Sequence, residues 1–234
     1  MSNEIILIVS LLVIYSMVIL WYNLFGARGL MCFSVLATVL ANIEVMIVVR
    51  AFGLEQTLGN VLFASTFLVT DILSETEGKK VSRQAVNIGI LASVSFVLIS
   101  QSWMLYTPSE SDIIFPSIKS VFSGIPRVII SSVLVYAICQ RFDVWAYHKW
   151  WDFTTKKFGD KRKYLWLRNN GSTLISQLLN IVLFNICAFG GTYDAKTVLS
   201  IIVSGYAIYV VTALLDTPFV YWARRIYEKK QVSK

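Results

Sequence analysis

The sequence predicts an all-α polytopic membrane protein, with six to seven transmembrane helices packed as a single domain over residues 1–234. Hydrophobic residues make up 56% of the chain and charged residues only 15%, whereas a soluble domain has about 25% charged residues. The mean hydropathy is +0.64. The apolar runs are long enough to cross a bilayer as helices. They do not alternate as barrel strands would, so helices are the expected form.

Seven stretches have the length and apolar character of a membrane span, namely 4–25, 30–52, 57–75, 84–106, 118–141, 170–190 and 197–223. The first lacks the basic start and small-residue cleavage site of a signal peptide. We therefore expect residues 4–25 to be an additional N-terminal span.

Basic residues are distributed unevenly among the connecting segments. Of the 21 Lys and Arg residues, all but Arg50, Lys119, Lys196 and Arg127 follow the first, third and fifth stretches or lie at the C-terminus. Cytoplasmic loops are enriched in basic residues, so the N-terminus is expected outside and the C-terminus in the cytoplasm. Residues 142–168 mix aromatic with basic side chains and are expected to form a cytoplasmic loop. Lipid headgroups are favoured over nucleic acid as its partner.

Several kinds of chemistry find no support in the sequence. There is no P-loop pattern for nucleotide hydrolysis and no paired-histidine metal motif. The single histidine lies in the basic aromatic segment, so a Ser-His-Asp site is unsupported. The three cysteines are far apart and are expected to be packing residues. We expect no metal, no cofactor and no enzymatic activity, and an enzyme using carboxylates alone is the weaker alternative.

The sixth stretch carries a stripe of polar side chains. Asn170, Thr173, Gln177 and Asn180 are spaced so that they share one helical face, and Phe184 continues it. Polar groups inside a membrane usually face the bundle interior and mark a ligand site or pathway. A hydrogen-bonded seam between helices is the alternative.

The third stretch ends with Asp71 and Glu75, which are one helical turn apart and can face one cavity. The alternative is a pair of interfacial carboxylates neutralised by the nearby Lys79, Lys80 and Arg83. Burial could let one of these carboxylates carry a coupling proton.

The other stretches also contain ionisable or amide side chains. Arg127 requires a carboxylate such as Asp71, Glu44 or Asp216, a ligand, or backbone carbonyls. Asp216 lies beside Pro218, which frees a carbonyl one turn upstream and marks a weak point typical of transporter helices. The remaining polar candidates in or beside the spans are Asn42, Gln140 and Asp143.

Four segments together resemble one family, the queuosine precursor transporters, also called the vitamin uptake transporters. The segments are TFLVTDILSETEGKK (66–80), PRVIISSVLVYAICQRFDVW (126–145), WLRNNGSTLISQLLN (166–180) and ALLDTPFVY (213–221). The resemblance covers residues 30–225. It implies a bacterial inner-membrane, multi-pass carrier that imports a 7-deazaguanine base, such as 7-cyano-7-deazaguanine, 7-aminomethyl-7-deazaguanine or queuine. Family members commonly have six spans, so residues 4–25 would be extra.

The resemblance carries over to matching positions only. These are Asp71, Glu75, Gly78, Lys79, Arg127, Gln140, Asp143, Val144, Arg168, Asn170, Ser172, Thr173, Ser176, Gln177, Asp216 and Pro218. The chain departs from the family pattern at Glu77, where an aromatic residue is common. Asn180 stands where an acidic residue is usual and Tyr209 where several members have lysine. The last two changes are consistent with a lost ion pair or a shifted substrate.

A deazaguanine would be bound through its donor edge, its carbonyl and its ring faces. Asp71 or Glu75 would take the donor edge, and Gln177, Asn180 and Asn42 the other polar atoms. Stacking would come from Phe184, Phe67 or Trp103. The complete predicted binding set is Asn42, Asp71, Glu75, Arg127, Gln140, Asn170, Thr173, Gln177, Asn180 and Phe184, with Asp71, Asp143 and Asp216 as coupling or gating residues.

Two other kinds of function remain open from the sequence. One is a membrane substrate-binding subunit that works with a separate ATPase module, or a carrier for another small heterocycle or vitamin. The other is a structural or assembly protein, which would bind no small molecule. Beyond the substrate and the bilayer no partner is implied, and a homodimer is one alternative for the oligomeric state.

Overall fold

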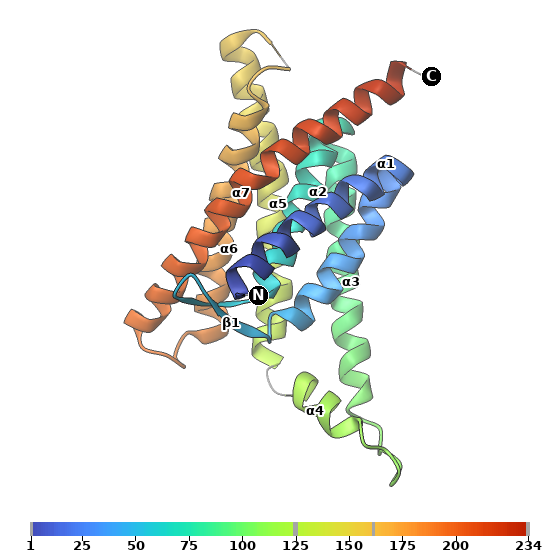
Figure 1. Cartoon of the computed structure of the whole chain (residues 1–234), viewed down its shortest axis with the longest axis vertical. Coiled ribbons are helices and arrows are strands. Elements are labelled where there is room, and N and C mark those ends of the chain that lie inside the picture. Colours follow the sequence, from blue (N-terminus) through green and yellow to red (C-terminus); the bar gives the residue numbers. More distant parts are fainter. Residues whose placement is uncertain (1, 124–125, 161, 233–234) are drawn as a thin grey trace.

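The computed structural model describes residues 2–123, 126–160 and 162–232, and over these residues the chain is almost entirely helical. Figure 1 shows one elongated bundle, with α4 at one end and the C-terminus at the other. The elements in chain order are α1 (Asn3–Glu44), β1 (Val48–Ala51), β2 (Leu54–Thr57), α2 (Gly59–Thr76), α3 (Lys79–Trp103), α4 (Phe115–Ser123), α5 (Pro126–Phe158), α6 (Leu165–Phe189) and α7 (Ala195–Val232). The all-helical fold predicted from the apolar runs is confirmed.

The outer surface of the bundle is apolar. Leu91 and Leu98 on α3 are 66% and 67% exposed, and Leu199 and Val203 on α7 are 61% and 62% exposed. Apolar surface on this scale is not stable in water and indicates contact with lipid. Within the described residues four helices, α1, α3, α6 and α7, combine the length and hydropathy needed to cross a membrane. These features support a helical membrane protein.

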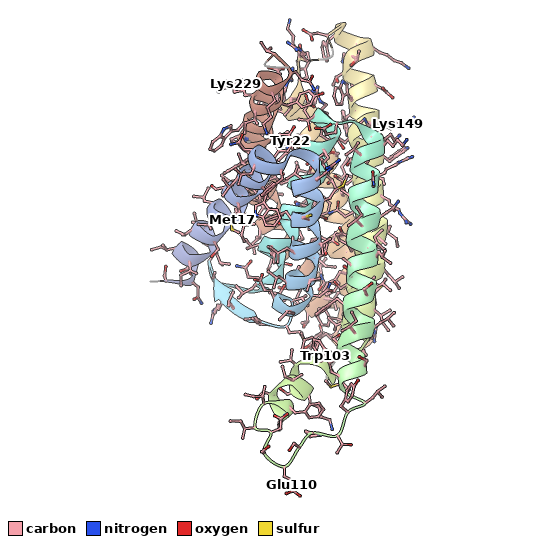
Figure 2. All side chains as sticks on the ribbon, turned by 90° about the vertical axis from the view of Figure 1, so that its right-hand side faces the viewer. Met17, Tyr22, Trp103, Glu110, Lys149 and Lys229 are labelled. Carbon is pink, nitrogen blue, oxygen red and sulfur yellow. The ribbon has the colours of Figure 1, made fainter. Side chains whose placement is uncertain are left out.

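The two ends of the bundle differ in character. Figure 2 shows Lys149 and Lys229 toward one end, and Trp103 and Glu110 at or near the other. The loops that precede α3 and α6 lie toward the lysine-rich end, whereas the β1–β2 hairpin and α4 lie toward the opposite end (Figure 1). We refer to these as the basic end and the hairpin end.

Helix α1 consists of two arms that meet at Gly26. This residue has φ 63° and ψ −145°, a backbone conformation essentially restricted to glycine. Figure 1 shows the first arm rising toward the basic end and the second returning from it. The first arm packs against α7, where the Tyr15 hydroxyl donates to the Thr212 carbonyl at 3.3 Å. Residues 4–25 are therefore helical and packed against the bundle.

The second expected span, 30–52, is wrong at its C-terminal end. The helix stops at Glu44, and β1 pairs antiparallel with β2. Phe52 and Gly53 both have positive φ, 54° and 74°, as a tight hairpin turn requires. The β-branched residues Val48 and Val49 favour an extended strand just before this turn.

Helix α2 is the centre of the bundle. Nearly all of its residues are buried, and it contacts α1, α3, α5 and α7. Its hydroxyl side chains are satisfied locally, since Ser65 and Thr66 donate to the carbonyls of Leu62 and Phe63. Such bonds let a polar helix lie inside an apolar bundle. Helix α2, with its hydroxyl and carboxylate side chains, is therefore enclosed by the other helices.

Two predictions about the region around α5 are wrong. The expected span 118–141 is divided between α4 and α5. The segment 142–168, expected as a loop, is helical to Phe158, and α6 begins at Leu165. No glycine or proline lies between Pro126, where α5 begins, and Gly159. Gly159 has φ 70° and ends the helix. As a consequence Asp143 lies inside a helix and is completely buried.

Candidate functional site

One face of α6 carries a row of completely buried polar residues that contacts three other helices. Thr173 donates to Asp71 Oδ2 on α2 at 2.8 Å. Ser176 donates to Asp143 Oδ1 on α5 at 2.6 Å. Asn169 Nδ2 donates to Asp216 Oδ1 on α7 at 2.7 Å. The α6 stripe thus holds a carboxylate from each of its neighbours.

Gln140 connects α5 to α2 just beside this row. Its amide nitrogen donates to Thr66 Oγ1 at 2.6 Å, and its amide oxygen accepts from Thr70 at 3.2 Å. Both bonds are buried, so they hold the amide in one orientation. Gln140 thus lies beside the α6 row, with its amide oxygen and nitrogen both occupied.

Gln177 differs from the other polar residues of this row because its amide group is not hydrogen-bonded to any described residue. It is completely buried, yet neither its amide oxygen nor its amide nitrogen has a partner among the described residues. Asp71 Oδ1, Asp216 Oδ2 and Asn169 Oδ1 are also buried without a partner. Buried polar groups are normally hydrogen-bonded. These four unsatisfied side chains come from α2, α6 and α7.

A small pocket of about 40 Å³ lies one turn along α6 from Gln177, toward the hairpin end. Its lining combines amide and hydroxyl groups with aromatic rings, as small-molecule sites commonly do. Its lining includes Asn60, Phe63, Ser132, Asn180, Phe184 and Tyr209.

The polar residues of this pocket form a chain of hydrogen bonds. Tyr209 donates to Asn60 Oδ1 at 3.1 Å, and Asn180 Nδ2 donates to the Tyr209 hydroxyl at 3.4 Å. The two departures from the family pattern, Asn180 and Tyr209, are therefore in direct contact. Ser132, which also lines the pocket, donates to Asn42 Oδ1 at 3.2 Å.

Glu75 lies at the basic end, in a tight network of charges. Arg168 reaches its carboxylate through Nε at 2.9 Å and through Nη2 at 2.7 Å. Arg224 Nη1 lies 3.3 Å away, and the Tyr147 hydroxyl donates to it at 2.7 Å. The guanidinium of Arg168 also lies 4.3 Å from the ring centre of Trp151. Helices α2, α5, α6 and α7 are thereby joined at this end.

This network corrects the interfacial alternative for the carboxylates. Glu75 is neutralised by arginines from α6 and α7, and no ion pair between described residues joins it to Lys79, Lys80 or Arg83. Its side chain is only 3% exposed. The tertiary fold supplies the counter-charge, which proximity in sequence did not reveal.

Other predicted site residues lie away from the centre. Arg127 is exposed and donates to the carbonyls of Cys187 and Gly190 at 2.7 and 2.6 Å, so its partners are carbonyls and not Asp71, Glu44 or Asp216. Asn170 is half-buried and donates to Thr217 at 2.8 Å. Phe184 lines the pocket, whereas Trp103 packs against Phe122 of α4 and does not.

Sequence reasoning missed several residues of the site. Asn169 precedes Thr173 by four residues, so helical spacing alone could have added it to the α6 stripe. Asn60, Ser132 and Tyr209 had no such signal, because only the packing of separate helices brings them together. Within the described residues no three His, Cys, Asp or Glu side chains are arranged to hold a metal ion.

Comparison with known proteins agrees with this picture. Residues 57–223 match a family described as "Putative vitamin uptake transporter". The chain belongs to this family. It is also 35% identical over 212 residues to a "Probable queuosine precursor transporter" of Bacillus subtilis (strain 168), covering 91% of this chain and 90% of the relative. No solved structure matches it.

Membership of the vitamin uptake transporter family provides the functional context for the buried polar site. The chain is a multi-pass membrane transporter and not an enzyme. A polar centre enclosed by apolar helices, next to a small lined pocket, is the arrangement expected where a small molecule crosses a membrane.

Proposed function

We propose that this chain is a carrier of the bacterial inner membrane that imports a 7-deazaguanine precursor of queuosine into the cytoplasm. Support comes from the name of the Bacillus relative, which matches most of both chains. The basic end would face the cytoplasm because Lys and Arg are enriched there. In the proposed arrangement six to seven spans cross the bilayer, with the N-terminus outside.

The observation that carries this proposal is the unpartnered amide of Gln177. A side chain with two donors and one acceptor group, buried with no partner, is poised for a planar ligand rich in hydrogen-bonding edges. A deazaguanine offers N–H donors and, beside them, a carbonyl acceptor. Phe63 and Phe184 in the pocket would contact its ring faces.

The expected carboxylates take unequal parts in this arrangement. Glu75 is engaged by Arg168 in the conformation described here, whereas Asp71 keeps one oxygen without a partner. Asp71 and the Gln177 oxygen are therefore the acceptors available to the donor edge. Glu75 would reach the ligand only after its arginines separate.

The two ends of the molecule suggest how access is controlled. The pocket lies toward the hairpin end, and the network around the Glu75–Arg168 ion pair joins four helices at the basic end. This corresponds to a carrier closed toward the cytoplasm. Opening of the ion pair would let the substrate leave on that side.

The test is ligand-induced thermal stabilisation of the purified protein, measured with 7-cyano-7-deazaguanine and with guanine. A ligand that binds the native state raises the melting temperature. Gln177→Ala should weaken the Kd about 10- to 100-fold, as expected when a buried hydrogen-bonding group is lost. The matched control is Gln84→Ala, which removes an exposed glutamine. Equal affinity in Gln177→Ala and wild type would contradict the proposed site.

A further inference from the structure

We propose that Asp71, Asp143 and Asp216 form a proton-binding site whose occupation couples substrate import to proton entry. The inference rests on the proposed transport function and adds its energy source. It follows from the placement of three buried carboxyl groups, of which only Asp71 is also proposed to contact the substrate.

The three carboxyl groups come from α2, α5 and α7 and are completely buried. Asp71 interacts electrostatically with both of the others. None of the ion pairs between described residues includes any of the three. Buried like charges without a counter-ion are strongly unfavourable, and carboxyl groups relieve this by taking up protons.

One proton can be placed on the carboxyl group of Asp216. Asn169 Nδ2 already donates to Asp216 Oδ1, while Asp216 Oδ2 and Asn169 Oδ1 are both buried without a partner. Two unsatisfied acceptors thus belong to one hydrogen-bonded pair of side chains. A proton on Asp216 Oδ2 turns that oxygen into a donor, and Asn169 Oδ1 is the free acceptor on its partner.

Asp71 and Asp143 accommodate a second proton between them. Their carboxyl groups lie close enough for a hydrogen bond when one of them is protonated. Thr173 and Ser176, from successive turns of α6, each donate to one of the two. A shared proton removes the repulsion between the carboxylates and adds a hydrogen bond.

The groups around the trio supply no competing cation. The α1 arm contributes the Tyr15 phenol, α3 contributes the Ser82 hydroxyl, which donates to the Thr70 carbonyl at 3.0 Å, and α5 contributes Cys139. Tyr147 and Glu75 lie toward the basic end, where Arg168 and Arg224 are already paired with Glu75. Among the described residues, therefore, no cation is paired with the trio.

Proton binding and substrate binding are coupled because the same helices enclose both sites. When all three aspartates are ionised, packing α2, α5, α6 and α7 around them removes three charges from water, which is strongly unfavourable. Protons taken from the outside water form O–H bonds to the carboxyl groups and remove that cost. Gln177 follows Thr173 by one turn on α6, so closure around the trio and around the substrate involves one helical face. The protons leave to the cytoplasmic water when the basic end opens.

The test uses wild-type protein in liposomes loaded with a pH-sensitive dye, with the outside one pH unit more acidic. Radiolabelled 7-cyano-7-deazaguanine is added, and both its uptake and the internal pH are followed. We expect substrate-dependent internal acidification. Accumulation should reach about tenfold for each proton carried per substrate, because one pH unit is a tenfold proton gradient.

The possible results separate the coupling from the transport function. Substrate that enters but equalises regardless of the pH gradient would overturn the proton site and leave the proposed function intact. Accumulation driven by a Na⁺ gradient at equal pH would likewise overturn it. Absence of any substrate entry would contradict both.

Variants assign the effect to residues. Asp143→Asn and Asp216→Asn keep the shape of the side chain and should each abolish substrate-dependent acidification. Glu77→Gln is the matched control, because Glu77 is an exposed carboxylate at the end of α2. Normal acidification in both Asn variants would overturn the assignment. Size-exclusion and thermal unfolding establish that each variant is folded.

Discussion

The ion pair between Arg168 and Glu75 gives a quantitative prediction. The Arg168 side chain is 0% exposed and that of Glu75 is 3% exposed, and the closest approach is 2.7 Å. Removing one partner of a buried pair costs about 3 to 5 kcal/mol, because the other charge stays buried. In Arg168→Gln the Glu75 carboxylate still has Arg224 at 3.3 Å. The expected loss is therefore near the lower limit, about 3 kcal/mol.

Thermal unfolding in detergent measures this loss. For a chain of this size about 1 kcal/mol corresponds to roughly 2 to 4 °C, so Arg168→Gln should lower the Tm by about 6 to 12 °C. Arg162→Gln is the matched control. Its pair with Glu228 spans 3.6 Å and the side chains are 76% and 40% exposed. Surface pairs contribute at most about 1 kcal/mol.

A double variant separates the ion pair from the packing of Arg168. Glu75→Gln combined with Arg168→Gln leaves no uncompensated charge, so it should be more stable than Arg168→Gln alone. The reasoning would be refuted if Arg168→Gln lowered the Tm no more than Arg162→Gln does.

Two further predictions concern a backbone break and the single histidine. Gly26→Ala should cost about 1 to 3 kcal/mol because its conformation is strained for any other residue, and an unchanged Tm would show that the break between the α1 arms relaxes. Burial, together with nearby Lys79 and Arg83, lowers the pKa of His148 to about 4. His148 lies beyond the expected span 118–141. It should stay neutral in the folded protein between pH 5 and 8, so His148→Gln should leave the pH profile of uptake unchanged; a shifted profile would contradict this. Since its folded-state pKa is depressed, this histidine lowers stability only as the pH falls below about 6.5 toward 4.

Much of the fold could be predicted because bilayer-length apolar runs leave few choices. The positions of α2, α3 and α6 follow from them within five residues at each end, and so does the start of α7, which continues nine residues past its expected end. The hairpin at 48–57 and the continuation of α5 to Phe158 could not be predicted in this way. Hydropathy does not distinguish a β-branched strand from the end of a span. Basic and aromatic residues also look the same in a loop as on a helix that extends past the membrane.

The site was predictable where one helix carries it. The face of α6 with Thr173, Gln177 and Asn180 follows from helical spacing alone, and all three are buried as expected. The partners of charged residues were not predictable, because Glu75 finds its counter-charges on α6 and α7, far away in sequence. Hydrogen bonds such as Tyr209 to Asn60 depend on how separate helices pack.

Uptake of 7-cyano-7-deazaguanine into liposomes that contain this chain alone, without ATP, is the most direct test of the proposed carrier. We predict entry of the deazaguanine well above that into protein-free liposomes, weak or no entry of guanine, and loss of entry in Gln177→Ala. Entry only after a separate ATPase module is added would show that the chain is a binding subunit. No entry of any deazaguanine into liposomes with folded protein would contradict the proposed substrate.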